Sequence, residues 1–229
     1  MPIAADAEIE ITAFEWVPDF AKGYVRDIRP RWACEELGLA YRERLISAVS
    51  RPEWYYRDQP WGQVPHLRDG EVSVFESGAT LVHLGERGGQ GSALLPASGQ
   101  SRAAVLSWTF AAFNSVEPLL FEWVNVNLFA AREEWAKLRR PSLLSDLGKR
   151  LDRLEAALAD REWLSGAFSI ADIAMVTTLR GADDSSLIEE RPALAAYYAR
   201  GLARPGFQTA LSDQLAAFSA APTREPTGA

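Results

Sequence analysis

The chain has few of the residues from which disulfides and metal sites are built. Its 229 residues include one cysteine, Cys34, and two histidines, His66 and His83. A single cysteine excludes an intramolecular disulfide and a CxxC dithiol site. Two histidines without partner ligands are too few for a typical metal site. We therefore expect no metal centre.

Long apolar runs and positive charge are also scarce. No stretch approaches the roughly 18–20 apolar residues of a membrane helix, and the opening MPIAADAEIE lacks the basic and apolar regions of a secretory signal. The chain has 24 lysines and arginines against 31 aspartates and glutamates, a formal net charge of −7. Such a balance gives no general attraction to nucleic acid or anionic membranes. We expect a cytoplasmic globular protein that binds neither.

The first ninety or so residues alternate strand and helix patterns. Residues 8–14 alternate polar and apolar side chains, which is typical of a strand. Gly38 stands where a glycine commonly ends a helix, and Asp69-Gly70 is typical of a two-residue hairpin turn. The predicted elements are strands at 8–14, 41–46, 66–68 and 71–75, and helices at 27–37 and 77–86, with a short helix or irregular turn near 51–62.

From about Ser101 the pattern is helical throughout. Pro118 is expected to kink or divide a long helix, and Ser169 three residues before Asp172 resembles a capping box with aspartate in place of glutamate. The fold class is therefore α/β followed by all-α, with domains predicted at 7–90 and 98–218. One predicted helix carries an apolar stripe of leucines at spacings of three and four, namely Leu144, Leu147, Leu151, Leu154 and Leu158.

Two short motifs in the first half call for an explanation. Pro65 precedes a predicted strand, although proline cannot donate to a strand ladder. Glu76 and Ser77 open the next helix, where free backbone N–H groups and the helix dipole favour an anion. Ser77 is equally suited to capping the helix, and Glu76 to its first turn.

These motifs, in this order and over this pattern of elements, resemble the cytosolic glutathione S-transferase family of the bacterial type. The resemblance covers nearly the whole chain. It implies an N-terminal thioredoxin-like domain (β-α-β-α-β-β-α), an all-helical C-terminal domain and a homodimer. The stretches that carry it are Gln59-Pro-Trp-Gly62, Gln63-Val64-Pro65, Glu76-Ser77-Gly-Ala79, Ser169-Ile-Ala-Asp172 and Ala203-Arg-Pro-Gly-Phe207.

The resemblance implies a glutathione site in the first domain. Val64, before a cis proline at Pro65, would pair with the ligand's backbone as a strand does. Ser77 and the helix N-terminus would bind the γ-glutamyl carboxylate, and Glu76 would face the ammonium group. The glycine carboxylate is left to Gln63, Arg51 or Arg57.

The thiol of glutathione must lose its proton before it can act as a nucleophile. The family uses a hydroxyl or thiol donor after the first strand, and Tyr24 has the only hydroxyl between Phe14 and Pro30. We expect Tyr24 to be this donor, assisted by the Val25 N–H; the alternative is an ordinary loop aromatic. Cys34 lies inside a predicted helix, where a core position is expected rather than catalysis.

The resemblance implies a transferase in which the glutathione thiolate attacks a small apolar electrophile, with glutathione as co-substrate and no metal. The candidate electrophile pocket is formed by Trp16, Trp108, Asn114 and Glu117, of which the last two fit a solvated helix face equally well. Two alternatives are a non-catalytic binding or dimerisation module and a glutathione-dependent reductase that uses Cys34.

Overall fold

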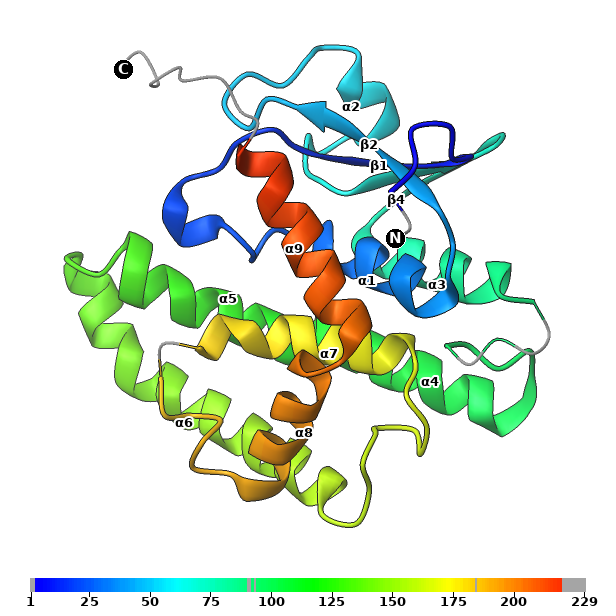
Figure 1. Cartoon of the computed structure of the whole chain (residues 1–229). Coiled ribbons are helices and arrows are strands. Elements are labelled where there is room, and N and C mark those ends of the chain that lie inside the picture. The colour runs from blue at the N-terminus through cyan, green and yellow to red at the C-terminus, as the bar shows by residue number, and fades with distance from the viewer. Residues whose placement is uncertain (1–2, 90–91, 93, 184, 220–229) are drawn as a thin grey trace. The chain divides into compact units, whose positions relative to one another are not determined.

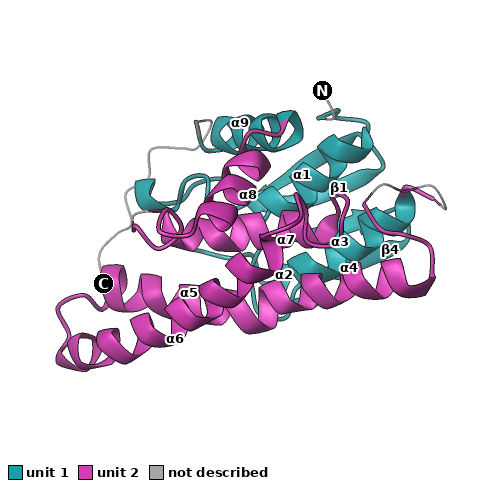
Figure 2. Ribbon diagram, turned by 90° about the horizontal axis from the view of Figure 1, so that it is seen from below, with its two compact units in different colours: residues 1–87, 205–229 teal, residues 88–204 magenta. Residues whose placement is uncertain are grey.

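The structure is a computed structural model that describes residues 3–89, 92, 94–183 and 185–219. The chain forms two compact units, residues 1–87 with 205–229, and residues 88–204 (Figure 2). Residue 90, the predicted end of the first domain, lies outside the described residues. The predicted domains 7–90 and 98–218 stay a prediction, and they differ from the compact units in where the last helix belongs.

The first unit contains the elements predicted for the first half of the chain (Figure 1). Gly70, with φ of +56°, stands in the hairpin as expected. The last helix of the chain joins this unit. The elements are β1 (Ile9–Phe14), a 3₁₀ turn (Asp19–Ala21), α1 (Ile28–Leu37), β2 (Tyr41–Ile46), α2 (Tyr55–Asp58), β3 (His66–Asp69), β4 (Val72–Phe75), α3 (Ser77–Arg87) and α9 (Pro205–Ser219).

The four strands form one mixed sheet in the order β2-β1-β3-β4. β1 pairs in parallel with β2 and antiparallel with β3, which pairs antiparallel with β4. Helices α1 and α3 cover one side of the sheet and α2 lies on the other (Figure 1). Alternation places Ile9, Ile11 and Ala13 of β1 in the core. The predicted α/β architecture of the first half is confirmed.

Helix α1 begins and ends as the sequence predicts, within a residue. Gly38 follows its last residue with φ of +65°, and the Gly38 N–H donates to the carbonyl oxygens of Cys34 and Glu35. Every residue from Ile28 to Cys34 is buried, including two arginines. α1 is therefore a core helix of the unit, and Cys34 belongs to its packing.

Helix α9 packs on α1 within the same unit. The rings of Phe207 and Trp32 meet edge to face at 5.0 Å between centroids, and the Tyr41 hydroxyl donates to Asp213 at 3.3 Å. Burial and the nearby carboxylate of Asp213 raise the pKa of Glu35 to about 7. Glu35, at the contact between α1 and α9, is therefore harder to ionise than an ordinary glutamate.

This pKa shift makes the stability depend on pH. Because the folded-state pKa of Glu35 lies above its ordinary 4.5, the folded state holds a proton that the unfolded state loses, and this stabilisation disappears as the pH rises from 4.5 to about 7. Glu35→Gln should therefore raise the free energy of unfolding above pH 7 and change it least at pH 4.5. Urea denaturation at both pH values, with the exposed Glu53→Gln as control, checks this; equal effects at both would contradict it.

The second unit is helical in all its regular elements among the described residues. Regular α-helix stops at a π-helical segment, Ala112–Val116, and resumes at Glu117, directly before Pro118, so the predicted division of the helix is confirmed. The helices are α4 (Gly99–Ala111), α5 (Glu117–Val124), α6 (Glu134–Leu158), α7 (Ile170–Leu179) and α8 (Pro192–Leu202), with a second π-helical segment at Asn125–Phe129 and a 3₁₀ turn at Arg180–Ala182.

The leucine stripe of α6 differs from the prediction at one end. Leu147, Leu151, Leu154 and Leu158 are buried, but Leu144 is 44% exposed and Leu143 takes the buried place. Leu143 lies four residues before Leu147, so both spacings satisfy the helical period and the pattern alone does not decide between them.

One helical run in the second unit, Gly99–Phe129, is long and apolar enough to cross a membrane. Its best window has a mean hydropathy of 1.2, and 28% of that window is buried. Length and composition alone are weak evidence, because helices in the cores of globular proteins meet the same criteria.

Candidate functional site

Three stretches that lie far apart in the sequence come together in the first unit. Val25 packs against a cluster formed by Ile46, Tyr55 and Val64. The guanidinium of Arg29, at the start of α1, donates to the Ser77 hydroxyl oxygen at 2.9 Å. The turn before α1, the stretch before β3 and the start of α3 are therefore neighbours.

The stretch before β3 is held by two side chains from the segment between β2 and β3, one of them on α2. The Tyr55 hydroxyl donates to the carbonyl oxygen of Gln63 at 2.6 Å, and the Arg51 Nε–H donates to that of Gly62 at 2.8 Å. The bond between Val64 and Pro65 is cis, as expected. Val64 and Pro65 are buried while Gln63 is exposed. The backbone around Val64 is thus fixed by its surroundings.

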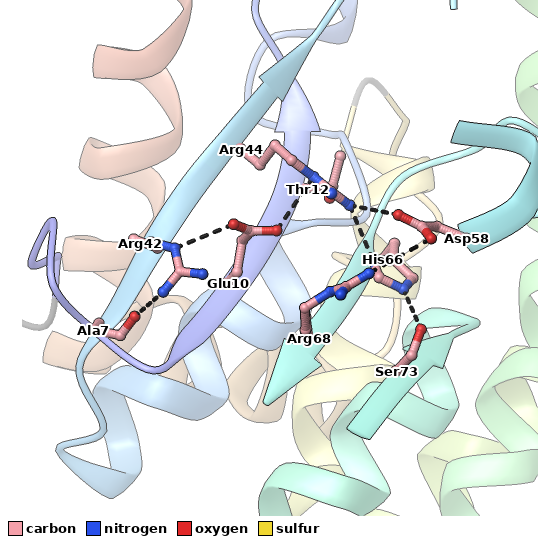
Figure 3. Close-up of polar contacts among 9 residues, drawn as sticks. All are labelled: Ala7, Glu10, Thr12, Arg42, Arg44, Asp58, His66, Arg68 and Ser73. Atoms are coloured by element: carbon pink, nitrogen blue, oxygen red, sulfur yellow. Dashed lines mark hydrogen bonds and ion pairs between the residues drawn. The ribbon is translucent and has the colours of Figure 1, made fainter. Parts of the chain in front are cut away.

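A polar network on the α2 side of the sheet fixes the residue that follows Pro65 (Figure 3). His66 is buried, with its Nε2 2.8 Å from the Ser73 hydroxyl and its Nδ1 3.4 Å from Arg44 Nη2. Arg44 also pairs with Asp58 of α2 at 3.0 Å, and Arg68 lies 3.6 Å from the same carboxylate. Burial lowers the pKa of His66, which favours the neutral ring. This network ties α2 to the strands beside the candidate site.

Glu76 has an unusual backbone conformation. Its φ of +69° makes it the only non-glycine residue with positive φ among those described, a strained geometry that recurs at functional sites. Its carbonyl oxygen accepts from the Thr80 N–H at 3.0 Å, so the helix proper begins at Ser77. The Glu76 carboxylate is exposed and has no hydrogen-bond or ion-pair partner among the described residues. It is free to meet a cation.

Ser77 is the first residue of α3 and is buried. Its hydroxyl oxygen accepts a hydrogen bond from the Arg29 guanidinium, and the choice between a capping role and a ligand-binding role for Ser77 stays a prediction. The first N–H groups of any helix lack partners within the helix. The start of α3 therefore gathers these N–H groups, one hydroxyl and one guanidinium.

Sequence reasoning missed Arg29. It lies on the predicted helix between Arg26 and Arg31, where a charged side chain is normally expected to face solvent. Its partner, Ser77, is 48 residues away in the sequence. In the structure Arg29 is only 2% exposed. A buried guanidinium beside a hydroxyl and a helix N-terminus favours a carboxylate, which it binds through charge-assisted hydrogen bonds.

The structure places Tyr24 in the turn before α1. The Tyr24 N–H donates to the Ala21 carbonyl at 3.0 Å, and the side chain is 45% exposed. The next carbonyl, that of Val25, accepts from the Ile28 N–H at 3.1 Å. The thiol-activating roles of Tyr24 and Val25 stay predictions. Cys34, in contrast, is fully buried, and burial raises the pKa of its thiol.

The residues predicted for the electrophile pocket belong to different units. Trp16 is half-buried between β1 and the 3₁₀ turn of the first unit. In the second unit, Trp108 of α4 and Glu117 of α5 are half-buried, and Asn114 is exposed on the π-helical segment. The pocket stays a prediction. Among the described residues, no group of three or more histidine, cysteine, aspartate or glutamate side chains is placed to hold a metal ion.

Family models match both halves of the chain. The N-terminal domain of glutathione S-transferases matches residues 20–86, and the C-terminal domain matches residues 129–200. A glutathione S-transferase of Silene vulgaris is 29% identical over 172 residues, which cover 70% of this chain and 78% of that protein. One from Hyoscyamus muticus is 30% identical over 161 residues, covering 66% and 75%.

A solved structure supports the same assignment of the fold. The glutathione transferase of Burkholderia graminis, with two glutathione molecules bound per subunit, superposes with a TM-score of 0.79 at 24% identity and covers 91% of this chain and 90% of that one. The first unit therefore carries the thioredoxin-like fold and the second unit the helical fold of that family. With both domains matched in order, this chain belongs to the glutathione S-transferase family.

Proposed function

We propose that the protein is a glutathione transferase that joins glutathione to a small apolar electrophile. The observation that carries this proposal is the start of α3, where the exposed Glu76 carboxylate, which has no partner in the part of the chain that the structure describes, stands next to the buried pair of Ser77 and Arg29. The γ-glutamyl end of glutathione carries an ammonium and a carboxylate on one carbon. Glu76 matches the ammonium, and Ser77, Arg29 and the helix N–H groups match the carboxylate.

The remaining contacts follow from the same placement. The Val64 backbone pairs with the cysteinyl part of the tripeptide, and Gln63, Arg51 or Arg57 binds the glycine carboxylate. The sulfur then lies near the turn before α1, where Tyr24 and the Val25 N–H stabilise the thiolate. Support for glutathione as the ligand comes from related structures, such as the Burkholderia graminis enzyme above, which was solved with glutathione bound.

The reaction needs no net oxidant or reductant. The thiol gives its proton to solvent, and the thiolate forms a carbon–sulfur bond with its lone pair. In a substitution the leaving group departs with the electrons of its bond to carbon; in an addition to an activated double bond, the neighbouring carbon takes up a proton. Trp16, Trp108, Asn114 and Glu117 are the proposed contacts of the electrophile. We also propose a cytoplasmic homodimer.

A conjugation assay tests the proposal. The wild-type protein, reduced glutathione and a generic aryl halide should yield the thioether and one halide ion per molecule, faster than the uncatalysed reaction. Glutathione binding without turnover would support the non-catalytic module instead. The buried position of Cys34 and its raised pKa count against a reductase that uses this thiol.

A further inference from the structure

The last helix contributes one buried polar side chain to the turn that precedes α1. Gln214 of α9 is fully buried. Its Nε2 donates to the Val25 carbonyl oxygen at 3.0 Å and to Asp27 Oδ1 at 2.7 Å. The two acceptors stand on either side of Arg26, so a single carboxamide binds the backbone of Val25 and the side chain of Asp27 in the turn that follows Tyr24.

The other side of Asp27 is held as firmly. Arg31 Nε donates to Asp27 Oδ2 at 2.7 Å, and Arg31 Nη1 lies 2.5 Å from Glu43 of β2. Both Asp27 and Arg31 are buried. Burial raises the pKa of Asp27, and the attraction of Arg31 acts in the opposite direction. With both carboxylate oxygens occupied, Asp27 links α9 to α1 at the base of the turn, and Arg31 extends this link to β2.

Gln214 is itself held in place by the packing of α9. Ala210 and Phe207, one and two turns before Gln214 on this helix, are buried, and Phe207 meets the Trp32 ring. Ala217 and Phe218 are buried beyond it. The amide is therefore carried on a rigid element, as an effective positioning group must be.

We propose that Gln214 is a positioning residue for activation of the glutathione thiol. It fixes the turn from Tyr24 to Asp27, so that the Tyr24 hydroxyl and the Val25 N–H are held where the sulfur binds. The last helix thereby contributes to thiol acidity through the turn. This inference rests on the proposed function, and it assigns a residue about 190 positions away from the turn. Displacing catalytic groups by about 1 Å can cost up to about 100-fold in rate.

The test is Gln214→Met, which keeps the size of the side chain and removes its donor. We expect the pKa of the bound glutathione thiol, followed by the ultraviolet absorbance of the thiolate, to rise, and kcat to fall about tenfold. The KM for glutathione should change little, because Glu76, Ser77 and Arg29 are untouched. Gln214→Asn, which withdraws the amide by one methylene, should shift both quantities in the same direction by less, and it serves if the methionine variant does not fold.

Asp213→Asn is the matched control. It alters the neighbouring polar contact of α9, with Tyr41, and leaves the turn alone. It should change thermal stability without moving the thiol pKa. If Gln214→Met lowers only the melting temperature and leaves the thiol pKa and kcat at their wild-type values, Gln214 is merely structural and the inference is wrong.

Hydrogen exchange at residues 24–27, measured without glutathione, separates this inference from the proposed function. Faster exchange in Gln214→Met than in Asp213→Asn is expected if Gln214 holds the turn, and equal exchange would overturn the inference. A wild-type protein that binds no glutathione would instead overturn the proposed function.

Discussion

Tyr24→Phe is expected to lower kcat/KM for glutathione conjugation by about 100-fold. The substitution removes one hydroxyl and leaves the ring. A preorganised donor aimed at developing negative charge contributes about 10²–10³ in rate, and Tyr24 is the residue proposed to supply it. The turn that carries it is anchored by Gln214 and packed through Val25, so the loss is expected in the chemical step rather than in the fold.

The measurement is steady-state conjugation together with titration of the bound thiol. The variant should show a raised thiol pKa and a nearly unchanged KM for glutathione. Tyr56→Phe is the matched control, because Tyr56 is 43% exposed against 45% for Tyr24 and also belongs to the first unit. Wild-type activity in Tyr24→Phe would show that the donor lies elsewhere.

Cys34→Ala should retain most of the conjugation activity. Loss of activity in this variant would favour the alternative function, a glutathione-dependent reductase that uses Cys34.

Asp172→Asn is expected to destabilise the second unit by about 3 kcal/mol. Asp172 is fully buried and accepts from the Leu164 N–H at 3.0 Å, the Ser169 N–H at 2.9 Å and the Tyr197 hydroxyl at 3.2 Å. In the asparagine variant, an NH₂ group replaces one of the two carboxylate oxygens. This group is itself a donor, so it cannot accept the hydrogen bonds that the oxygen accepted. Buried donors left without acceptors cost about 1–3 kcal/mol each.

Burial raises the pKa of Asp172 to about 6, while the donors around it pull in the opposite direction. Ser169 in turn receives the Ala171 N–H, which completes the capping box that the sequence predicts. Urea denaturation of wild type and variant at neutral pH measures the loss. The exposed Asp160→Asn is the control, and a loss below about 1 kcal/mol, the range of ordinary surface changes, would contradict this account of α7.

The elements that the sequence predicts well are those with local causes. Gly38 ends α1, Asp69-Gly70 turns the hairpin, and Ser169 with Asp172 starts α7; each depends on residues a few positions apart. Periodicity predicted the wrong buried leucine in the first half of α6. Leu143 and Leu144 both fit the helical repeat, and only the packing of the unit determines that Leu143 is the buried one.

The candidate site shows a sharper limit. Val64 and Glu76-Ser77 can be predicted as site residues from short motifs of a few neighbouring residues, and the family resemblance supports the same prediction. Arg29 and Gln214 act on residues 48 and 189 positions away, respectively, and an arginine or glutamine on a helix has no local feature that marks it as buried. Such long-range partners become visible only when the fold brings them together.

The most direct test of the central claim is calorimetric titration of reduced glutathione into the wild-type protein and into Ser77→Ala. The account predicts saturable binding by wild type, and an affinity lower by about tenfold or more in the variant, since a hydrogen bond to a charged group contributes about 1.5–3 kcal/mol. Binding that Ser77→Ala leaves unchanged would place the carboxylate elsewhere. No binding by the wild-type protein would contradict the account.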